Sequence, residues 1–173
     1  MSLSRRALMA SALALTGAGF AARAVAQTAP QTAPMPIYDE ALVNNWQNWS
    51  WAKVELSVEA GGAKPLRAEG TPYQAVAFHH DPFDAAPYSK LTFFANGGAD
   101  GGQSLMVKAL VGGKAVDPGV TITLKARTWQ PAAVPLKDLL GPGSVAGKMI
   151  DGLWFQAGAD GAKPFYLDKI QFE

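Results

Sequence analysis

Apolar and polar residues alternate with a period of two along most of the chain. In the run WAKVELSV, residues 51–58, the apolar Ala52, Val54, Leu56 and Val58 fall on one side and mostly polar residues on the other. Successive side chains of a strand point to opposite faces of a sheet, so this alternation predicts a half-buried strand. We predict a further strand in each of the similar runs at residues 73–80, 88–96, 104–111, 120–126, 130–135, 150–157 and 165–172.

Clusters of Gly, Pro, Asn and Asp separate these runs, as in EAGGAKP (59–65) and VDPG (116–119). Such residues favour turns, and only residues 136–140 have the pattern of a helical turn. Short strands at this spacing, without helical crossovers, are typical of an antiparallel sandwich or barrel. The predicted fold class is therefore all-β, an antiparallel β-sandwich of the jelly-roll kind.

Two segments have the glycine content of nucleotide-binding loops but not their chemistry. Residues 96–104, NGGADGGQS, lack the Lys of a phosphate loop and precede an alternating run, so we interpret them as a hairpin loop. Residues 141–147, GPGSVAG, have the wrong spacing for a dinucleotide fingerprint and lie in no βαβ unit. Neither segment predicts nucleotide binding.

The first 26 residues have the three parts of an export signal peptide. A charged start with Arg5 and Arg6 precedes a mildly apolar run at 10–22 and the small-residue cleavage site Ala-Val-Ala at 24–26. The arginine pair and the weakly hydrophobic run favour a twin-arginine signal, with a general secretory signal as the alternative. The apolar run is too short for a stable membrane span. We therefore expect the mature protein in the periplasm or outside the cell.

Residues 27–36, QTAPQTAPMP, predict a Pro-rich leader, because proline favours extended backbone. One folded domain is then expected at 37–173, which is long enough to bury a core. Loss of the three arginines within residues 1–26 leaves twelve basic against fourteen acidic side chains, a net charge of about −2. Nucleic acid and anionic membranes require clustered Lys and Arg, so neither is expected as a partner. We expect a monomer without stable membrane insertion.

Metal binding is restricted by composition, because the chain has no cysteine and hence no disulfide or thiolate metal site. Asp39 opens the predicted domain and Asp168 lies in its last strand, each among apolar neighbours. A carboxylate in such surroundings is costly unless it is paired or bound to a cation. First and last strands of a sandwich commonly lie side by side, so these carboxylates with backbone carbonyls are a candidate calcium site. The alternative is that both are exposed at strand ends.

Candidate catalytic groups are few. His79 and His80 are neighbours on a predicted strand, so their side chains point to opposite faces and only one can face a ligand. No Gly-x-Ser-x-Gly motif and no cysteine accompany them, which argues against a hydrolytic triad. Glu55, Glu59 and Glu69 alternate with ordinary polar residues and are interpreted as a solvated face, which leaves a glycosidase or lyase as the weaker alternative.

Tryptophans are the strongest candidates for ligand binding. Trp49 and Trp51 are two apart and would share one face of a strand, whereas Trp46 falls on the preceding turn. An indole ring either fills a core or offers a flat surface on which the C–H face of a sugar ring stacks, with amides and imidazole binding the hydroxyls. Both interpretations stay open for each ring. The candidate ligand-binding residues are Trp46, Trp49, Trp51, Gln74, His79, Trp129 and Gln156.

Several segments together have a pattern found in a known family: IYDEALVNNWQNWSW, YSKLTFFANGG, GGQSLMVKAL, RTWQPAAVPLKDL and DGLWFQ through to FYLDKIQFE. They resemble bacterial carbohydrate-binding-module-like domains of the galactose-binding-like jelly-roll type. The resemblance covers residues 36–173, and its most specific parts are the opening Tyr-Asp with the Trp cluster and the closing Phe-Tyr-x-Asp-x-Ile. Such domains are usually attached to secreted enzymes that degrade polysaccharides.

The resemblance implies a β-sandwich with a concave glycan-binding face and a structural calcium near the joined termini. Asp39 and Asp168 match the ion-binding positions, although this chain has Lys169 where the family often has a second acid. Trp49, Trp51, His79 and Gln156 lie in segments that line the glycan face in such domains. The expected function is non-catalytic binding of a polysaccharide or cell-surface glycan. The alternatives are an envelope protein that binds another protein, with the tryptophans in its core, and a jelly-roll enzyme.

Overall fold

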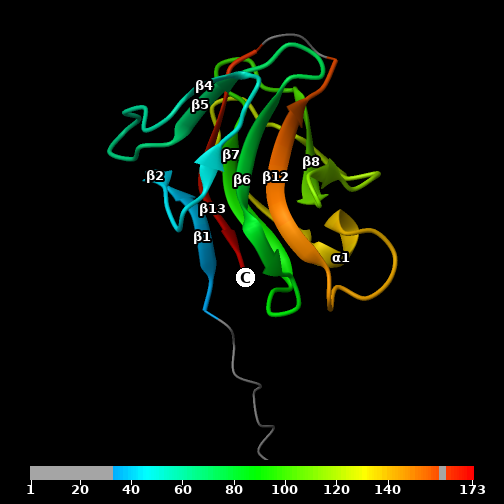
Figure 1. The fold of residues 1–173 in the computed structure, drawn as a ribbon. Coiled ribbons are helices and arrows are strands. Elements are labelled where there is room, and N and C mark those ends of the chain that lie inside the picture. Colours follow the sequence, from blue (N-terminus) through cyan, green and yellow to red (C-terminus); the bar gives the residue numbers. More distant parts are fainter. Residues whose placement is uncertain (1–32, 160–162) are drawn as a thin grey trace, which may run out of the picture. The chain divides into compact units, whose positions relative to one another are not determined.

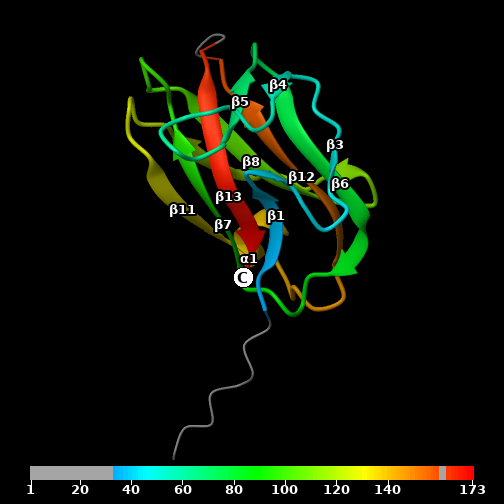
Figure 2. The same cartoon turned by 90° about the vertical axis from the view of Figure 1, so that its left-hand side faces the viewer.

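A computed structural model describes residues 33–159 and 163–173 of the chain. Within this part, nearly all regular structure is β-strand, arranged in two antiparallel sheets that face each other (Figures 1 and 2). The predicted all-β sandwich is thus confirmed. The predicted signal peptide, residues 1–26, and most of the predicted leader lie outside the described residues.

We name the two sheets A and B. Sheet A contains, in order, β11, β7, β13, β1 and β2, with β5 paired to β13 and β4 paired to β5. Its strands are β1 (Met35–Asp39), β2 (Ala41–Leu42), β4 (Lys53–Glu55), β5 (Leu66–Glu69), β7 (Lys90–Asn96), β11 (Gln130–Pro135) and β13 (Phe165–Phe172). Sheet B contains β10, β8, β12, β6 and β3, with β9 paired to β8. Its strands are β3 (Gln47–Asn48), β6 (Ala75–Asp84), β8 (Ser104–Val111), β9 (Lys114–Ala115), β10 (Val120–Thr123) and β12 (Met149–Ala157).

The core lies between the inner faces of the two sheets. Phe93 of β7 meets Phe155 of β12 with ring centroids 5.2 Å apart, which joins sheet A to sheet B. Phe78 of β6 packs edge-on against the same Phe155. Burial alternates along β7 and β8, so every second side chain of these two strands is left for the outer faces. The helical turn predicted at 136–140 is α1, Leu136–Leu139, which buries both of its leucines.

The first and last strands lie side by side, as the sequence predicts. Met35 pairs with Phe172 and Pro36 with Gln171 across β1 and β13. Strand β1 begins at Met35, so the last two residues of the predicted leader are part of the sheet. Residues of the described segments contain no helix long and apolar enough to cross a membrane.

Two sequence predictions are wrong in their local structure. Of the run 51–58 only Lys53–Glu55 forms a strand, because Ser57 has a φ of 58° and turns the chain away. Residues 96–104 are not a hairpin loop, since they carry the chain from β7 in sheet A to β8 in sheet B. In that crossing Gly97 donates its N–H to the Lys125 carbonyl at 2.9 Å. Strand β5 falls in a stretch where no strand is predicted.

Candidate ligand-binding face

The outer face of sheet B is built from the alternate side chains of β6, β12 and β8. Trp154 of β12 lies in register with Ala77 on one side and Lys108 on the other. Gln156, two residues on, lies in the same way between Ala75 and Met106. The two alanines of β6 are small, so their side of this face has room for aromatic side chains from another segment.

That segment is the irregular chain between β3 and β4, which runs along the edge of β6. Trp49 donates its backbone N–H to the Ala77 carbonyl at 2.9 Å, and Trp51 donates to the Ala75 carbonyl at 3.1 Å. The Ser50 hydroxyl accepts the Ala77 N–H at 2.9 Å. Because Trp49 and Trp51 bond to carbonyls two residues apart in β6, both indoles project onto the same outer face.

Trp49 and Trp51 are both held in place while much of each ring stays open to water. Trp49 stacks on His79 and donates its indole N–H to the Gln47 side chain at 3.0 Å, yet 57% of the residue is exposed. Trp51 meets Trp154 edge-on with centroids 5.2 Å apart and is 45% exposed. The indole N–H of Trp51 is also bonded within the protein, to the Tyr73 carbonyl, so the open parts of both rings are apolar.

Tyr73 is the most exposed large apolar residue of this face, at 80%. Its backbone has a φ of 72°, a conformation that is a strained outlier for a bulky residue. The Tyr73 carbonyl holds the chain there, because it accepts the Trp51 indole N–H at 2.9 Å and the Gln156 amide at 3.1 Å. A small hollow of about 130 Å³ beside Tyr73 is also lined by Gln156 and Met106. Sequence reasoning missed Tyr73, whose one visible signal is its place in the turn TPYQ.

Lys108 adds a positive charge at the far side of the same face. Its ammonium lies 5.9 Å from the centre of the Trp154 ring and forms an ion pair with Asp117. Sequence reasoning missed Lys108, whose one visible signal is its polar place between Val107 and Ala109 in the alternating run 104–111.

His79 and His80 do point to opposite faces. The His79 ring is covered by Trp49 on the outer face, whereas His80 packs against Trp46 and Phe83.

Three of the predicted ligand-binding residues lie elsewhere. Trp46 is buried, with only 4% exposed, and packs against Phe172 of sheet A, so it cannot offer a face to a ligand. Trp129 comes just before β11, and its ring meets Tyr166 of β13 in the other sheet. Gln74 serves the turn before β6, because its side chain accepts the Thr71 N–H at 2.9 Å. Of the predicted set the structure brings together Trp49, Trp51, His79 and Gln156.

The two predicted calcium ligands lie on the paired strands β1 and β13. Asp168 is buried and accepts the Lys169 backbone N–H at 2.9 Å. The pKa of Tyr38 is raised mainly by burial and, to a smaller extent, by the negative charge of Asp168. Asp39 is exposed, and its carboxylate lies 4.0 Å from the Lys169 ammonium. Within residues 33–159 and 163–173 no group of three or more His, Cys, Asp or Glu side chains is arranged to hold a metal ion. Calcium at this place would need backbone carbonyls or water for most of its ligands, so the side chains fit it poorly.

No model of a known protein family matches the chain. It is similar to an endoglucanase of Dictyostelium discoideum, with 28% identity over 133 residues, 70% of this chain. The chain spans only 18% of the length of that endoglucanase.

Solved structures of family 29 carbohydrate-binding modules have a similar fold. A variant made to probe ligand recognition has a TM-score of 0.60 and 14% identity, over 82% of this chain and 92% of that module. A complex with mannohexaose has a TM-score of 0.59 and 13% identity, over 81% and 90%. A complex with cellulohexaose has a TM-score of 0.59 and 13% identity, over 81% and 89%. The chain therefore has the β-sandwich fold of these carbohydrate-binding modules.

Proposed function

We propose that this protein is a non-catalytic carbohydrate-binding module that binds a polysaccharide chain on the outer face of sheet B. The observation that carries the proposal is the set of three exposed aromatic residues on this one face: Trp49, Trp51, and Tyr73, which lines a hollow with Gln156 and Met106. Large exposed apolar surfaces of this kind mark interaction sites on soluble proteins.

The chemistry of this face suits a sugar. A pyranose ring has apolar C–H faces and a rim of hydroxyl groups, so it stacks on aromatic rings and hydrogen-bonds around them. The amide side chain of Gln47 lies beside the Trp49 indole, and that of Gln156 lies close to the Trp51 indole. An amide both donates and accepts hydrogen bonds, which matches a hydroxyl in either role.

The comparisons favour the same ligand class. Two of the similar structures are complexes with mannohexaose and cellulohexaose, and the similar curated protein is an endoglucanase. We therefore expect a polysaccharide of the cellulose or mannan kind. The chain spans only 18% of the endoglucanase. A share of this size fits a binding module within a larger enzyme better than the complete enzyme with its activity.

Export is part of the proposal, because polysaccharides of this kind lie outside the cell. The sequence of residues 1–26 supports it, with a twin-arginine signal that leads to the periplasm or beyond. Cell fractionation of the expressed chain tests this point: recovery of the uncleaved chain in the cytoplasm alone would contradict it. We expect the exported protein to be a monomer, which sedimentation measures.

Affinity electrophoresis tests the binding function directly. The protein is run in native gels that contain soluble glucans or mannans, and insoluble cellulose and mannan are tested by co-sedimentation. Retardation or pull-down by at least one member of the panel is expected. Free migration in every gel, with no pull-down, would reject the proposed function.

A further inference from the structure

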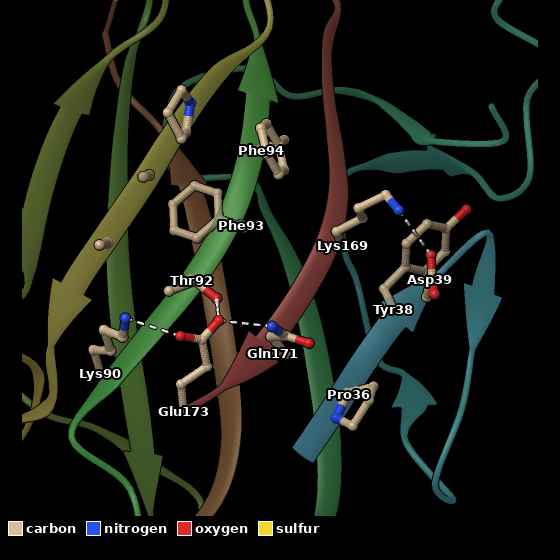
Figure 3. A pocket seen from close by; sticks show the side chains of 13 residues that line it. Pro36, Tyr38, Asp39, Lys90, Thr92, Phe93, Phe94, Lys169, Gln171 and Glu173 are labelled. Carbon is tan, nitrogen blue, oxygen red and sulfur yellow. Dashed lines mark hydrogen bonds and ion pairs between the residues drawn. The ribbon is translucent and has the colours of Figure 1, made fainter. Parts of the chain in front are cut away.

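A second hollow lies on the outer face of sheet A, on the opposite side of the sandwich from Trp49 and Trp51. It has a volume of about 630 Å³ and crosses the strands β11, β7, β13 and β1 (Figure 3). The alternate side chains of β7 that do not enter the core, Lys90, Thr92 and Phe94, form its floor. This hollow is far larger than the one of about 130 Å³ beside Tyr73.

The part of this hollow around Phe94, the upper part in Figure 3, is apolar. Phe94 is 40% exposed although its neighbour Phe93 is buried in the core. Pro131 of β11 lies opposite Phe94 in the sheet register, and Ala133 lies opposite Thr92. A phenyl ring beside a proline ring, next to small side chains, leaves a flat apolar surface in the sheet.

The lower part is polar and organised around one carboxylate (Figure 3). Glu173 accepts hydrogen bonds from Thr92 at 2.8 Å and from the Gln171 amide at 2.7 Å, and it pairs with the Lys90 ammonium at 2.8 Å. A hydroxyl, an amide oxygen and an ammonium each have further hydrogen-bonding capacity beyond one such contact. The network therefore presents pre-oriented groups to a ligand.

The charges of this hollow are balanced in pairs. Lys90 lies against Glu173, and Lys169 lies 4.0 Å from Asp39 at the other side. Neither an anionic nor a cationic ligand gains from a surface whose charges are already paired. A neutral molecule with one apolar face and many hydroxyl groups gains from both parts.

We propose that this hollow is a second binding site for a neutral sugar chain, so that the protein has two binding faces on opposite sides of the sandwich. The proposal takes its ligand class from the proposed function but concerns a separate surface. Two faces that point away from each other cannot act on one short oligosaccharide at once. They can hold two polysaccharide chains together, which raises overall avidity on a polysaccharide matrix.

Nuclear magnetic resonance titration with cellulohexaose and mannohexaose tests the proposal on the whole exported chain. The backbone amides of Thr92, Phe94 and Gln171 report on sheet A, and the indole N–H signals of Trp49 and Trp51 report on sheet B. Two groups of shifts with separate midpoints are expected.

Variants then separate the two sites. Phe94→Ala and Ala133→Arg should weaken binding at the sheet A amides by at least about tenfold and leave the indole shifts unchanged. Phe94 and Ala133 are both exposed, so folding should not depend on either. Leu56→Ala, with a similarly exposed apolar side chain, is the matched control and should change neither group. Trp49→Ala should weaken only the sheet B group.

Each outcome bears on one hypothesis. Shifts of the indoles alone, at saturating sugar, would overturn the second site and leave the proposed function intact. Shifts at sheet A alone would reject the proposed face of sheet B instead. Shifts at sheet A with a peptide of residues 27–34 and none with sugar would identify the Pro-rich leader as the occupant and overturn the sugar proposal. As a functional readout, the native protein should raise the viscosity of a soluble glucan, whereas Phe94→Ala should bind the glucan without doing so.

Discussion

The indole ring of Trp49 lies flat on the imidazole ring of His79, with ring centroids 3.7 Å apart and planes inclined by 17°. His79 belongs to β6, and Trp49 to the irregular segment that follows β3, so a rigid strand supports a residue that has no strand of its own. Stacking covers one face of the indole and fixes its plane. The other face is thereby prepared for a ligand without further loss of side-chain entropy on binding.

The supporting role of His79 predicts that ring shape matters there more than imidazole chemistry. We expect His79→Phe to keep glycan affinity nearly unchanged, because a phenyl ring stacks on the indole as well. His79→Ala removes a pair contact of about 0.5–1.5 kcal/mol and should weaken binding roughly 2- to 12-fold. Isothermal titration calorimetry measures both. Equal loss in the two variants would show that the imidazole itself contacts the ligand.

Trp49 and Trp51 should each contribute strongly to binding on sheet B. We expect Trp49→Ala and Trp51→Ala to lose about 1–3 kcal/mol each, a fall in affinity of roughly 5- to 150-fold. Trp129→Ala is the matched control, because Trp129 is exposed to 39% but its ring meets Tyr166 of sheet A, away from the Trp49 and Trp51 face. Near-ultraviolet circular dichroism confirms that the variants stay folded. An equal loss in Trp129→Ala would contradict the assignment of the face.

Replacement of Tyr73 by glycine should weaken glycan binding without lowering the stability of the fold. Glycine accepts a φ of 72° without strain, so we expect Tyr73→Gly to leave the free energy of unfolding unchanged or to raise it by up to about 1 kcal/mol. The same variant loses an exposed aromatic ring and should bind glycan several-fold more weakly. Urea denaturation and affinity electrophoresis on one preparation measure the two effects. Unchanged binding in this variant would remove Tyr73 from the site.

Glu173 should make stability depend on pH in the acid range. Its hydrogen bonds from Lys90, then from Gln171 and Thr92, lower the pKa of Glu173 from 4.5 to about 2. A carboxyl whose folded pKa is depressed stabilises the native state above its unfolded pKa, and this contribution is lost as the pH falls through the folded value. The melting temperature of the native protein should therefore exceed that of Glu173→Gln above about pH 4.5, with the difference vanishing near pH 2.

Lys90→Met is the control for this effect, because it keeps the carboxyl and removes the first of its partners. Between about pH 4.5 and pH 2, we expect the melting temperature of Lys90→Met to fall, but by less than that of the native protein. Parallel melting curves of the native protein and Glu173→Gln across that range would contradict the prediction.

The calcium prediction is tested by a chelator. If calcium binds beside Asp39 and Asp168, with backbone carbonyls or water as most of its ligands, it stabilises the native state by mass action. Excess EGTA should then lower the melting temperature and added calcium should restore it. In that case Asp168→Asn should remove the response, whereas Glu59→Gln, far along the chain, should keep it. A melting curve that EGTA leaves unmoved would show that Asp39 and Asp168 have no calcium role.

Much of the fold could be predicted because it depends on local alternation. The strands Ser104–Val111, Gln130–Pro135 and Phe165–Phe172 have the bounds that the pattern predicts. The run 51–58 has the same pattern but forms only a three-residue strand. Its first residues, Trp51 and Ala52, donate their backbone N–H groups to Ala75 of β6, more than twenty residues away. A local sequence pattern does not contain that partner.

By itself the sequence determined the class of the fold and the kind of chemistry on offer, because strand periodicity and the flatness of indole are properties of neighbouring residues and of single side chains. Only the tertiary structure decided where each ring lies. Trp46 and Trp49 are three residues apart, yet Phe172 covers the first and leaves the second open. Trp129 comes just before β11, and its ring lies against sheet A because it meets Tyr166 of β13. Tyr73 joins the face of sheet B because its carbonyl binds Trp51. Burial depends on which distant segments meet, and that is decided by the packing of the whole sandwich.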